Sequence, residues 1–546
     1  MFKKKIALVV AAMLMVLTVL AGCSANSKDT SQSTDGNTQL GSAVLNFNLA
    51  ADPRTIDPSL NDAIDGSHVI NNTFEGLMRE IDGELQNAMA ETLEISDDGL
   101  VYTFHLRDAK WSDGQPVKAQ DFEYGWKRVL DPLTAAPYAP HMFYIKNAQA
   151  YYEGKASIED VGIHSVDDKT FEITLKTPTP YFLSLITRGA FMPLRKDMVE
   201  KSPEGWAKDP ATAISNGPFV LAEYTIGDRL VLRKNANYWD AEKTKLDQIN
   251  YLMIIEASTA LTAYDSGEID IINAMPAQEI PRLMKEDPTF NVLPQLGTYY
   301  LIFNVNKAPT NDVKVRHALA LAIDRKAITE SVKKGGEIPA TGFNPIGLKD
   351  SAGNDFNKTA GDYGVNVDGG NVEEAKKLLT EAGFPDGKGF PQVTLLYNTS
   401  ESHKAVAEAI QEMWKKNLGI SVDLTNQEWA VFQESRKQGN FDIARGGYIG
   451  DYPDPVGLLE LFVTNSSNND PHWSNPEYDE LINQSRFAKG SERDELIYKA
   501  QDILMKDLPV TPIYYYTDPV MAKEYVKNWQ KNSMSYWYFG RTSIEK

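Results

Sequence analysis

Residues 102–122 read YTFHLRDAKWSDGQPVKAQDF, and this stretch shows how the chain is built. From Leu100 to Leu106, aromatic or aliphatic side chains alternate with polar ones, which is the period-two pattern of a half-buried strand. Over Ala119–Leu130 the pattern changes to helical spacing, with Phe122 and Trp126 on one face. A strand followed by an amphipathic helix predicts a local α/β unit.

The same alternation of strands and helices continues along the chain. Further strands are predicted at Val44–Leu49, Phe171–Leu175, Val393–Tyr397, Ile420–Leu424 and Phe441–Ala444, and further helices at Val313–Lys333 and His403–Asn417. The helix at 403–417 lies between two strands and is followed by Gly419, which predicts a β-α-β unit. Gly335 and Gly336 are expected to end the helix at 313–333. A mixed α/β fold in at least two lobes follows.

Composition and charge exclude several classes of protein. The chain has 546 residues, 42% of them hydrophobic and 24% charged, which is typical of three or four globular domain-sized units. A net charge of -20 makes nucleic acid a poor partner. There is one cysteine, so an intrachain disulfide and a Cys-based zinc site are excluded. The seven histidines are scattered without an HExxH pattern, and we expect neither a metal site nor a cofactor.

The N-terminus has the features of an export signal. Three lysines at 3–5 precede an apolar run of 15 residues from Ile6 to Leu20, which is shorter than a membrane-spanning helix. The sequence LAGC at 20–23 resembles the bacterial lipoprotein box, in which cleavage before the cysteine leaves a thiol that carries diacylglycerol. Residues 1–22 are therefore predicted to be a lipoprotein signal peptide and Cys23 the lipidated residue. The alternative is an uncleaved anchor with an incidental cysteine.

The residues that follow the cysteine predict how the body is attached. Residues 23–43 are polar and lack aromatic side chains, which favours a flexible tether. Two acyl chains on Cys23 would hold the protein stably at a bilayer. We therefore expect the body to be anchored on the extracytoplasmic face of a cell membrane.

A series of motifs runs in a fixed order from residue 44 to about residue 520. They are YTFHLRDAKWSDGQPVKAQDF at 102–122, SNGPF at 215–219, NANYWD at 235–240, SGEIDI at 266–271, VKVRHALALAIDR at 313–325, EEAKKLLTEAGF at 373–384, QEW at 427–429, FDIARGGYIGDYPDP at 441–455 and PIYYY at 512–516. This series resembles the bacterial family-5 extracellular solute-binding proteins over nearly the whole mature chain. Within that family, the chain looks most like the oligopeptide-binding lipoproteins of ABC peptide importers.

The resemblance implies a fold and a domain organisation. The fold is the two-lobe clamshell of periplasmic binding proteins, of the class C type with three structural domains and a hinge between the lobes. The implied parts are a discontinuous lobe I at 44–74, 198–298 and 518–546, the family's extra domain at about 75–197, lobe II at 299–517, and hinge crossings near Tyr299–Tyr300 and Tyr514–Asp518. It also implies a monomeric binding protein that is not an enzyme and that works with the transmembrane permease subunits of an importer.

The resemblance also places the groups that would hold a peptide backbone and its ammonium group. A receptor for peptides of varied sequence must bind what all peptides share, and β-augmentation against RGGYIGD at 445–451 suits the amides. By resemblance, Gly447 and Ile449 pair with the peptide, joined from the facing lobe by Ile64 and Tyr138. Asp451 matches the acidic partner of the ammonium group. The alternatives are an ordinary glycine-rich turn and an aspartate that caps the turn before a proline.

Further positions match the binding of the carboxylate end and of side chains. The matching cations are Arg445, Arg436, His403 and Lys333, and the matching pocket-lining residues are Tyr448, Asn398, Trp429 and Tyr516. Having all four cations favours short peptides of about two to five residues, because an extended peptide lengthens by about 3.3 Å per residue. The alternatives are solvated surface charges and core aromatics. One departure is notable: some relatives carry a disulfide beside the cleft, where this chain has Gly297 and Ile449.

Three other functions stay open at this point. A family member could bind another cargo: a murein tripeptide, a signalling peptide, nickel or haem. A secreted hydrolase is disfavoured, because the S-x-x-K match at 331–334 lacks the S-D-N and K-T-G motifs that accompany it in penicillin-binding enzymes. An adhesin or chaperone would bind unfolded protein without requiring free termini.

Overall fold

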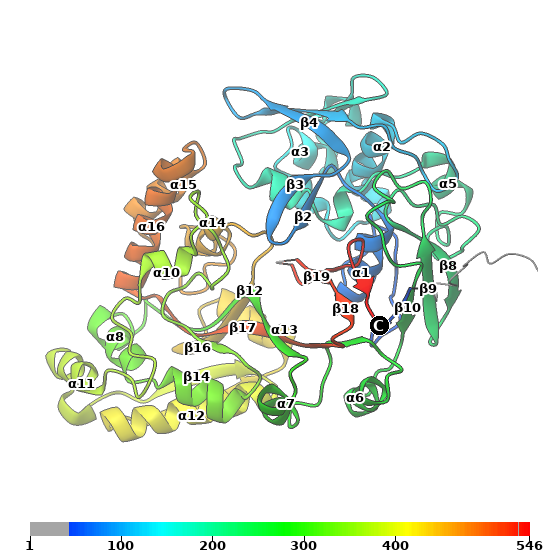
Figure 1. Cartoon of the computed structure of the whole chain (residues 1–546). Coiled ribbons are helices and arrows are strands. Elements are labelled where there is room, and N and C mark those ends of the chain that lie inside the picture. Colours follow the sequence, from blue (N-terminus) through cyan, green and yellow to red (C-terminus); the bar gives the residue numbers. More distant parts are fainter. Residues whose placement is uncertain (1–42, 533) are drawn as a thin grey trace, which may run out of the picture. The chain divides into compact units, whose positions relative to one another are not determined.

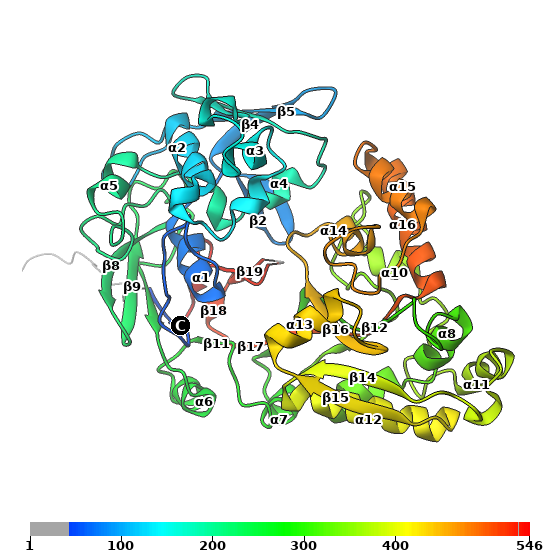
Figure 2. The same ribbon diagram turned by 180° about the vertical axis from the view of Figure 1, so that it is seen from behind.

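The computed structural model describes residues 43–532 and 534–546 (Figures 1 and 2). The predicted signal peptide, Cys23 and all but the last residue of the predicted tether lie outside these residues. Within the described residues, every helix is too short or too polar to span a bilayer.

The described part of the chain contains one large sheet of 11 strands. In spatial order the strands are β15 (Val422–Gln427), β14 (Val393–Asn398), β16 (Ile443–Ile449), β12 (Phe290–Phe303), β17 (Val510–Ala522), β11 (Ile271–Ile272), β1 (Val44–Asn48), β10 (Gln248–Leu252), β9 (Arg229–Lys234) and β8 (Phe219–Thr225), with β13 (Ile338–Pro339) paired to β17. A separate sheet consists of β4 (Ala90–Ile95), β5 (Val101–Leu106), β7 (Thr170–Thr174) and β6 (Ile163–Ser165). Smaller pairs are β2 (Met78–Ile81) with β3 (Glu84–Asn87), β18 (Val526–Lys527) with β21 (Ser543–Ile544), and β19 (Gln530–Lys531) with β20 (Trp537–Tyr538).

Helices surround these sheets. They are α1 (Ile64–Thr73), α2 (Ala119–Leu130), α3 (Ala148–Tyr152), α4 (Phe182–Leu185), α5 (Lys196–Lys201), α6 (Ala257–Ser266), α7 (Ile280–Glu286), α8 (Val313–Leu321), α9 (Arg325–Ala327), α10 (Phe356–Ala360), α11 (Val372–Glu381), α12 (Glu401–Leu418), α13 (Trp429–Lys437), α14 (Pro455–Leu459), α15 (Pro476–Ser485) and α16 (Gly490–Asp507). In Figure 1, α2 and α3 lie by β4, whereas α12 lies by β14 and α11 lies beside α8 and α12. This mixture confirms the predicted α/β fold.

Two long antiparallel strands connect the two ends of the large sheet. β12 and β17 pair with each other, while β16 pairs with the C-terminal half of β12 and β11 pairs with the end of β17. Their register shifts between the pair Pro294–Thr517 and the pair Thr298–Tyr515. This irregular step lies a few residues before the crossing predicted at Tyr299–Tyr300, and inside the second predicted crossing.

Most of the predicted elements are present, and one helix differs. The β-α-β unit forms as expected, with β14 and β15 parallel and α12 ending at Gly419, whose φ is +71°. The helix predicted at 313–333 is broken, because α8 ends at Leu321 and α9 begins at Arg325. The carboxylate of Asp324 accepts a hydrogen bond from the Ala327 N–H, and this new N-cap competes with continuation of the first helix.

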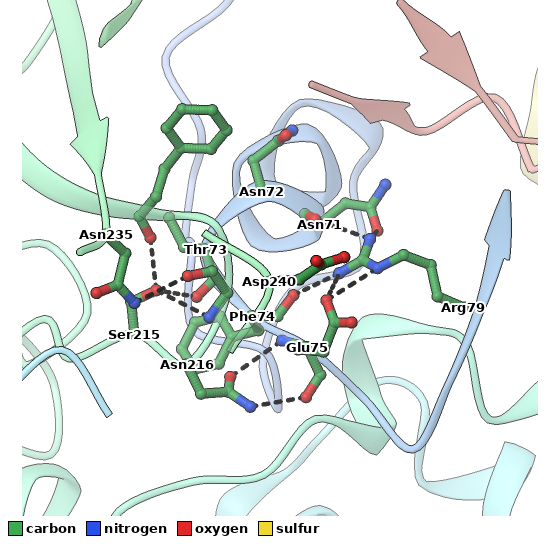
Figure 3. A network of polar contacts seen from close by, with 12 residues as sticks. Asn71, Asn72, Thr73, Phe74, Glu75, Arg79, Ser215, Asn216, Asn235 and Asp240 are labelled. Carbon is green, nitrogen blue, oxygen red and sulfur yellow. Dashed lines mark hydrogen bonds and ion pairs between the residues drawn. The ribbon is translucent and has the colours of Figure 1, made fainter. Parts of the chain in front are cut away.

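A buried polar network joins residues 71–79 to segments that are distant in the sequence (Figure 3). The guanidinium of Arg79 lies 2.8 Å from a carboxylate oxygen of Glu75, and both side chains are at most 5% exposed. Asn216 donates to the Glu75 carbonyl oxygen and accepts from its N–H, so part of the SNGPF motif is structural. Asn72 holds the C-terminal tail on α1 by accepting from the Phe539 N–H. These bonds tie together segments that are far apart in the sequence.

Candidate functional site

The strand β16 has one paired edge and one edge that is open over most of its length. All of β16 pairs with β12, but β14 pairs only with Ile443 and Ala444. The Gly450 N–H donates to the Leu296 carbonyl oxygen at 2.6 Å, so the even-numbered residues point their backbone groups at β12. The odd-numbered residues therefore point their N–H and C=O groups at the other edge. Within the described ranges no strand covers that edge beyond Ala444.

This geometry places the predicted backbone contacts on the open edge. Gly447 and Ile449 are odd-numbered residues of β16, so their amides are directed away from β12. The glycine-rich stretch is part of the strand, which corrects the alternative of an ordinary turn leaving it. Gly446 is needed for packing, because a Cβ there would lie 2.3 Å from the ring of Tyr300. The site thus offers a ready template for an added strand.

An acidic group lies just beyond the end of this open edge. Asp451 is 42% exposed on its side chain, and its carboxylate accepts a hydrogen bond of 2.8 Å from the hydroxyl of Tyr448. Its other oxygen lies 3.3 Å from the guanidinium of Arg188. Within the described chain the carboxylate meets these side-chain donors and no backbone N–H, so it does not act as the turn cap considered above.

A basic group lies at the start of the open edge. Arg445 is 9% exposed and donates to the side-chain oxygen of Asn398 at 3.4 Å and to the hydroxyl of Tyr516 at 3.2 Å. Its guanidinium also lies 5.0 Å from the ring centroid of Tyr299. In the part of the chain that the structure describes, no carboxylate forms an ion pair with it. A buried cation without a counter-charge is costly, so this position is suited to an incoming carboxylate.

The other two predicted basic residues in this region are His403 and Lys333. His403, near the start of α12, has a pKa lowered to about 4 by burial and by the charges of Arg445 and Lys333, which makes it a neutral imidazole at pH 7 rather than the predicted cation. Its ring lies 5.7 Å from that of Tyr299, and its Nδ1 has no hydrogen-bond partner in the described structure. The Lys333 ammonium donates to the Ser402 hydroxyl at 2.8 Å and lies 3.4 Å from a Glu337 oxygen.

The fourth predicted cation is already paired. Arg436 on α13 lies 3.3 Å from the carboxylate of Asp470, and both side chains are nearly buried. Its guanidinium also lies 4.9 Å from the ring of Phe432. Its charge is therefore compensated within the protein, unlike that of Arg445.

Three of the predicted contact residues are large apolar side chains on the surface. Ile64, Trp429 and Ile449 are 51%, 50% and 48% exposed. The alternative of a core aromatic therefore does not hold for Trp429, whereas Tyr138, Tyr448 and Tyr516 are partly buried. Gly297 lies directly opposite Ile449 across β12 and β16, so the two positions noted as a departure from the family resemblance are neighbours.

The structure adds residues that sequence reasoning missed. Arg188 lies between α4 and the short helix Gly189–Phe191, and it meets Asp451 although 263 residues separate them. His141 lies against Arg188, with 2.8 Å between its Nδ1 and the guanidinium. The ring of Tyr299 packs against the guanidinium of Arg445. No local pattern marks any of them, because each acquires its position through the fold.

Comparison with known proteins identifies the family. The model of "Bacterial extracellular solute-binding proteins, family 5 Middle" matches residues 84–470, which is more than half of the chain. This chain belongs to that family. The solute-binding protein is 39% identical over 497 residues to the oligopeptide-binding protein OppA of Bacillus subtilis, covering 89% of this chain and 90% of that one.

Solved structures agree with this assignment. The unliganded open form of the periplasmic murein tripeptide-binding protein MppA matches with a TM-score of 0.83 at 37% identity, covering 92% of this chain and 98% of that one. Haemophilus influenzae OppA in complex with the peptide RPPGFSPFR matches with a TM-score of 0.67 at 35% identity, covering 93% and 99%. The family resemblance and the two-lobe α/β fold predicted from the sequence are confirmed.

Proposed function

We propose that this solute-binding protein captures short oligopeptides, of about two to five residues, and delivers them to the permease subunits of an ABC importer. The peptide lies along the open edge of β16 and pairs with Gly447 and Ile449. Asp451 holds its ammonium group, and Arg445 with His403 and Lys333 holds its carboxylate. Side chains of the ligand contact Trp429, Ile64 and their neighbours. The work is binding, without a catalytic step.

One observation carries this proposal above the others. The open strand edge has a carboxylate just beyond one end and, at the other, a nearly buried guanidinium without an acidic partner in the described residues. A zwitterionic extended chain complements this arrangement in both charge and hydrogen bonding. A haem or nickel receptor would not need an acidic group, Asp451, at one end of a strand edge and a basic group, Arg445, at the other.

Binding measurements with modified termini test the proposal. Residues 24–546 are produced, freed of copurified ligand by unfolding and refolding, and titrated calorimetrically with Ala-Ala-Ala, its Nα-acetylated form and its C-terminal amide. We expect each modification to weaken binding at least tenfold, or about 1.4 kcal/mol. Equal binding of all three forms would contradict the terminal clamps and favour a chaperone. If none binds, short peptides are the wrong cargo, and mass spectrometry of the copurified ligand would identify the right one.

We also propose that the lobes follow the predicted boundaries and move about the step in β12 and β17. Lobe I would comprise 44–74, 198–298 and 518–546, with the extra domain at about 75–197, and lobe II would comprise 299–517. The register shift near residues 294–298 supports this assignment, because an interrupted ladder is easier to bend than a continuous one. Small-angle scattering with and without peptide would show a smaller radius of gyration on binding if the lobes close.

The protein is further proposed to be a monomer anchored to the extracytoplasmic face of the cell membrane through diacylglycerol on Cys23. The lipobox-like LAGC at 20–23 supports this. Wild type should partition into detergent phase after export, whereas Cys23→Ala should be released in soluble form. Detergent partitioning of both variants would contradict the lipid anchor.

A further inference from the structure

The end of the proposed site that would receive the ammonium group of a peptide already contains one positive charge, that of Arg188. The side chain of Arg188 is 6% exposed and lies 3.3 Å from Asp451. It is fixed on two further sides, because His141 contacts it at 2.8 Å and the ring of Tyr138 lies 5.4 Å away. The Nε of Arg188 is buried without a hydrogen-bond partner in the described structure.

The charges around Arg188 balance only while the site has no ligand. Burial, together with the charge of Arg188, lowers the pKa of His141 to about 4, so the imidazole is neutral at pH 7 and accepts the hydrogen bond. Asp451 is the one ion-pair partner of Arg188 in the described residues. Asp62, a second acid whose charge acts on Tyr138, is already paired with Arg54. One carboxylate therefore compensates one guanidinium.

A peptide ammonium group upsets this balance. It would share Asp451 with Arg188, so that two cations meet one carboxylate at a place where the guanidinium is buried and the carboxylate is only partly exposed. Like charges a few ångströms apart disfavour each other strongly when water is partly excluded. A ligand that brings its own carboxylate to this end restores neutrality, and an acidic side chain on its first residue is attached to the carbon that carries the ammonium group.

We propose that Arg188, held by His141 and Tyr138, makes this receptor prefer peptides whose first residue is Glu or Asp. The proposal rests on the proposed function, in which Asp451 receives the ammonium group. A cavity beside Asp451 offers a rival location for the first side chain. It has a volume of about 460 Å³ and is lined by Glu460 and Arg486, which pair with each other at 2.9 Å.

Calorimetry with three matched peptides tests the inference. Glu-Ala-Ala, Gln-Ala-Ala and Lys-Ala-Ala are titrated into wild type, Arg188→Gln, Arg188→Lys and Arg486→Gln. Wild type should bind the Glu peptide about tenfold more tightly than the Gln peptide, and the Lys peptide most weakly. Arg188→Gln should abolish this ratio, while Arg188→Lys and Arg486→Gln should retain it. Arg188→Met, which is also neutral, should abolish the ratio as well and takes the place of Arg188→Gln if that variant fails to fold.

Each contrary result has a distinct meaning. Equal binding of the Glu and Gln peptides by wild type overturns the inference, as does a Glu preference that survives in Arg188→Gln or disappears in Arg486→Gln. A preference for the Lys peptide overturns it too and places the side chain beside Glu460. Nα-acetylated Gln-Ala-Ala is run in parallel: if acetylation has no effect, the ammonium clamp itself has failed, whereas a tenfold loss with equal Glu and Gln binding rejects only the role of Arg188.

Discussion

Replacing Arg445 with methionine should separate binding from stability. A hydrogen bond to a charged group contributes about 1.5–3 kcal/mol, so loss of the guanidinium should weaken binding of a free peptide by roughly 10- to 150-fold. The amide form of the peptide should lose much less, because it brings no carboxylate. The folded protein loses two long hydrogen bonds, at 3.4 and 3.2 Å, and a cation–π contact of about 0.5–1 kcal/mol. It also sheds a buried, uncompensated charge, so the free energy of unfolding should change by less than about 1 kcal/mol.

Arg325 provides a matched control. It is 1% exposed, and its guanidinium donates to the carbonyl oxygens of Pro512 and Ala320 and to the hydroxyl of Thr511. Like Arg445 it has no ion-pair partner in the described residues, so the two variants differ in the hydrogen bonds they lose: Arg325→Met strands three buried acceptors and should cost about 2–5 kcal/mol of stability. Calorimetry gives the affinity, and urea denaturation gives the unfolding free energy. If Arg445→Met destabilises the protein as much as Arg325→Met, or binds the free peptide as tightly as wild type, Arg445 is a structural residue and the carboxylate assignment is wrong.

Three further predictions concern the edge, the packing and the pH dependence. Ile449→Pro removes an N–H that faces the open edge and should weaken the binding of all peptides about tenfold, whether or not their termini are blocked. Tyr448→Pro breaks the ladder to β12 and should lower the urea midpoint. Equal effects of the two variants on stability would contradict the assigned edges. Gly446→Ala should cost about 1–3 kcal/mol in urea denaturation, because its Cβ meets the buried ring of Tyr300, and an unchanged midpoint would refute this. Burial lowers the pKa of His68 to about 3, from about 6.5 in the unfolded chain, so the unfolded state binds the extra proton as the pH falls below about 6.5. The unfolding free energy should therefore fall by up to about 1.4 kcal/mol per pH unit for this histidine between about pH 6 and 4, and His68→Gln should show a shallower fall than wild type in pH-dependent urea melts.

Local patterns predicted the parts of the fold that depend on local physics. The helix at 119–130 and the unit formed by β14, α12 and β15 follow from apolar periodicity and a terminal glycine. The break before Arg325 was missed, because the apolar spacing continues through Ala322 and Ile323 while the cap of Asp324 depends on one side-chain hydrogen bond. Periodicity reports which face is buried, and it is insensitive to a competing cap.

The candidate site was predictable where its residues come from one strand. Arg445 and Gly447 lie on the same strand two residues apart, so their backbone groups face the same edge, and Asp451 follows two residues after the strand ends. Sequence could not show that Asp470 neutralises Arg436, or that Arg188 approaches Asp451 from 263 residues away. Those pairings depend on how segments distant in sequence are folded together.

The charges of the site explain why a ligand could bind both ends at once. Arg445 carries a buried charge with no ion-pair partner in the described residues, and Asp451 is shared between Tyr448 and Arg188. Burying an unpaired charge is unfavourable, so the free energy of unfolding is lower than it would be if the guanidinium had an acidic partner. A zwitterionic peptide supplies a carboxylate at one end and an ammonium group at the other, and the strand edge between them supplies hydrogen bonds that are indifferent to side chains. Affinity for peptides of varied sequence then follows from what the protein leaves unpaired, while Arg188 adds a preference at the first residue.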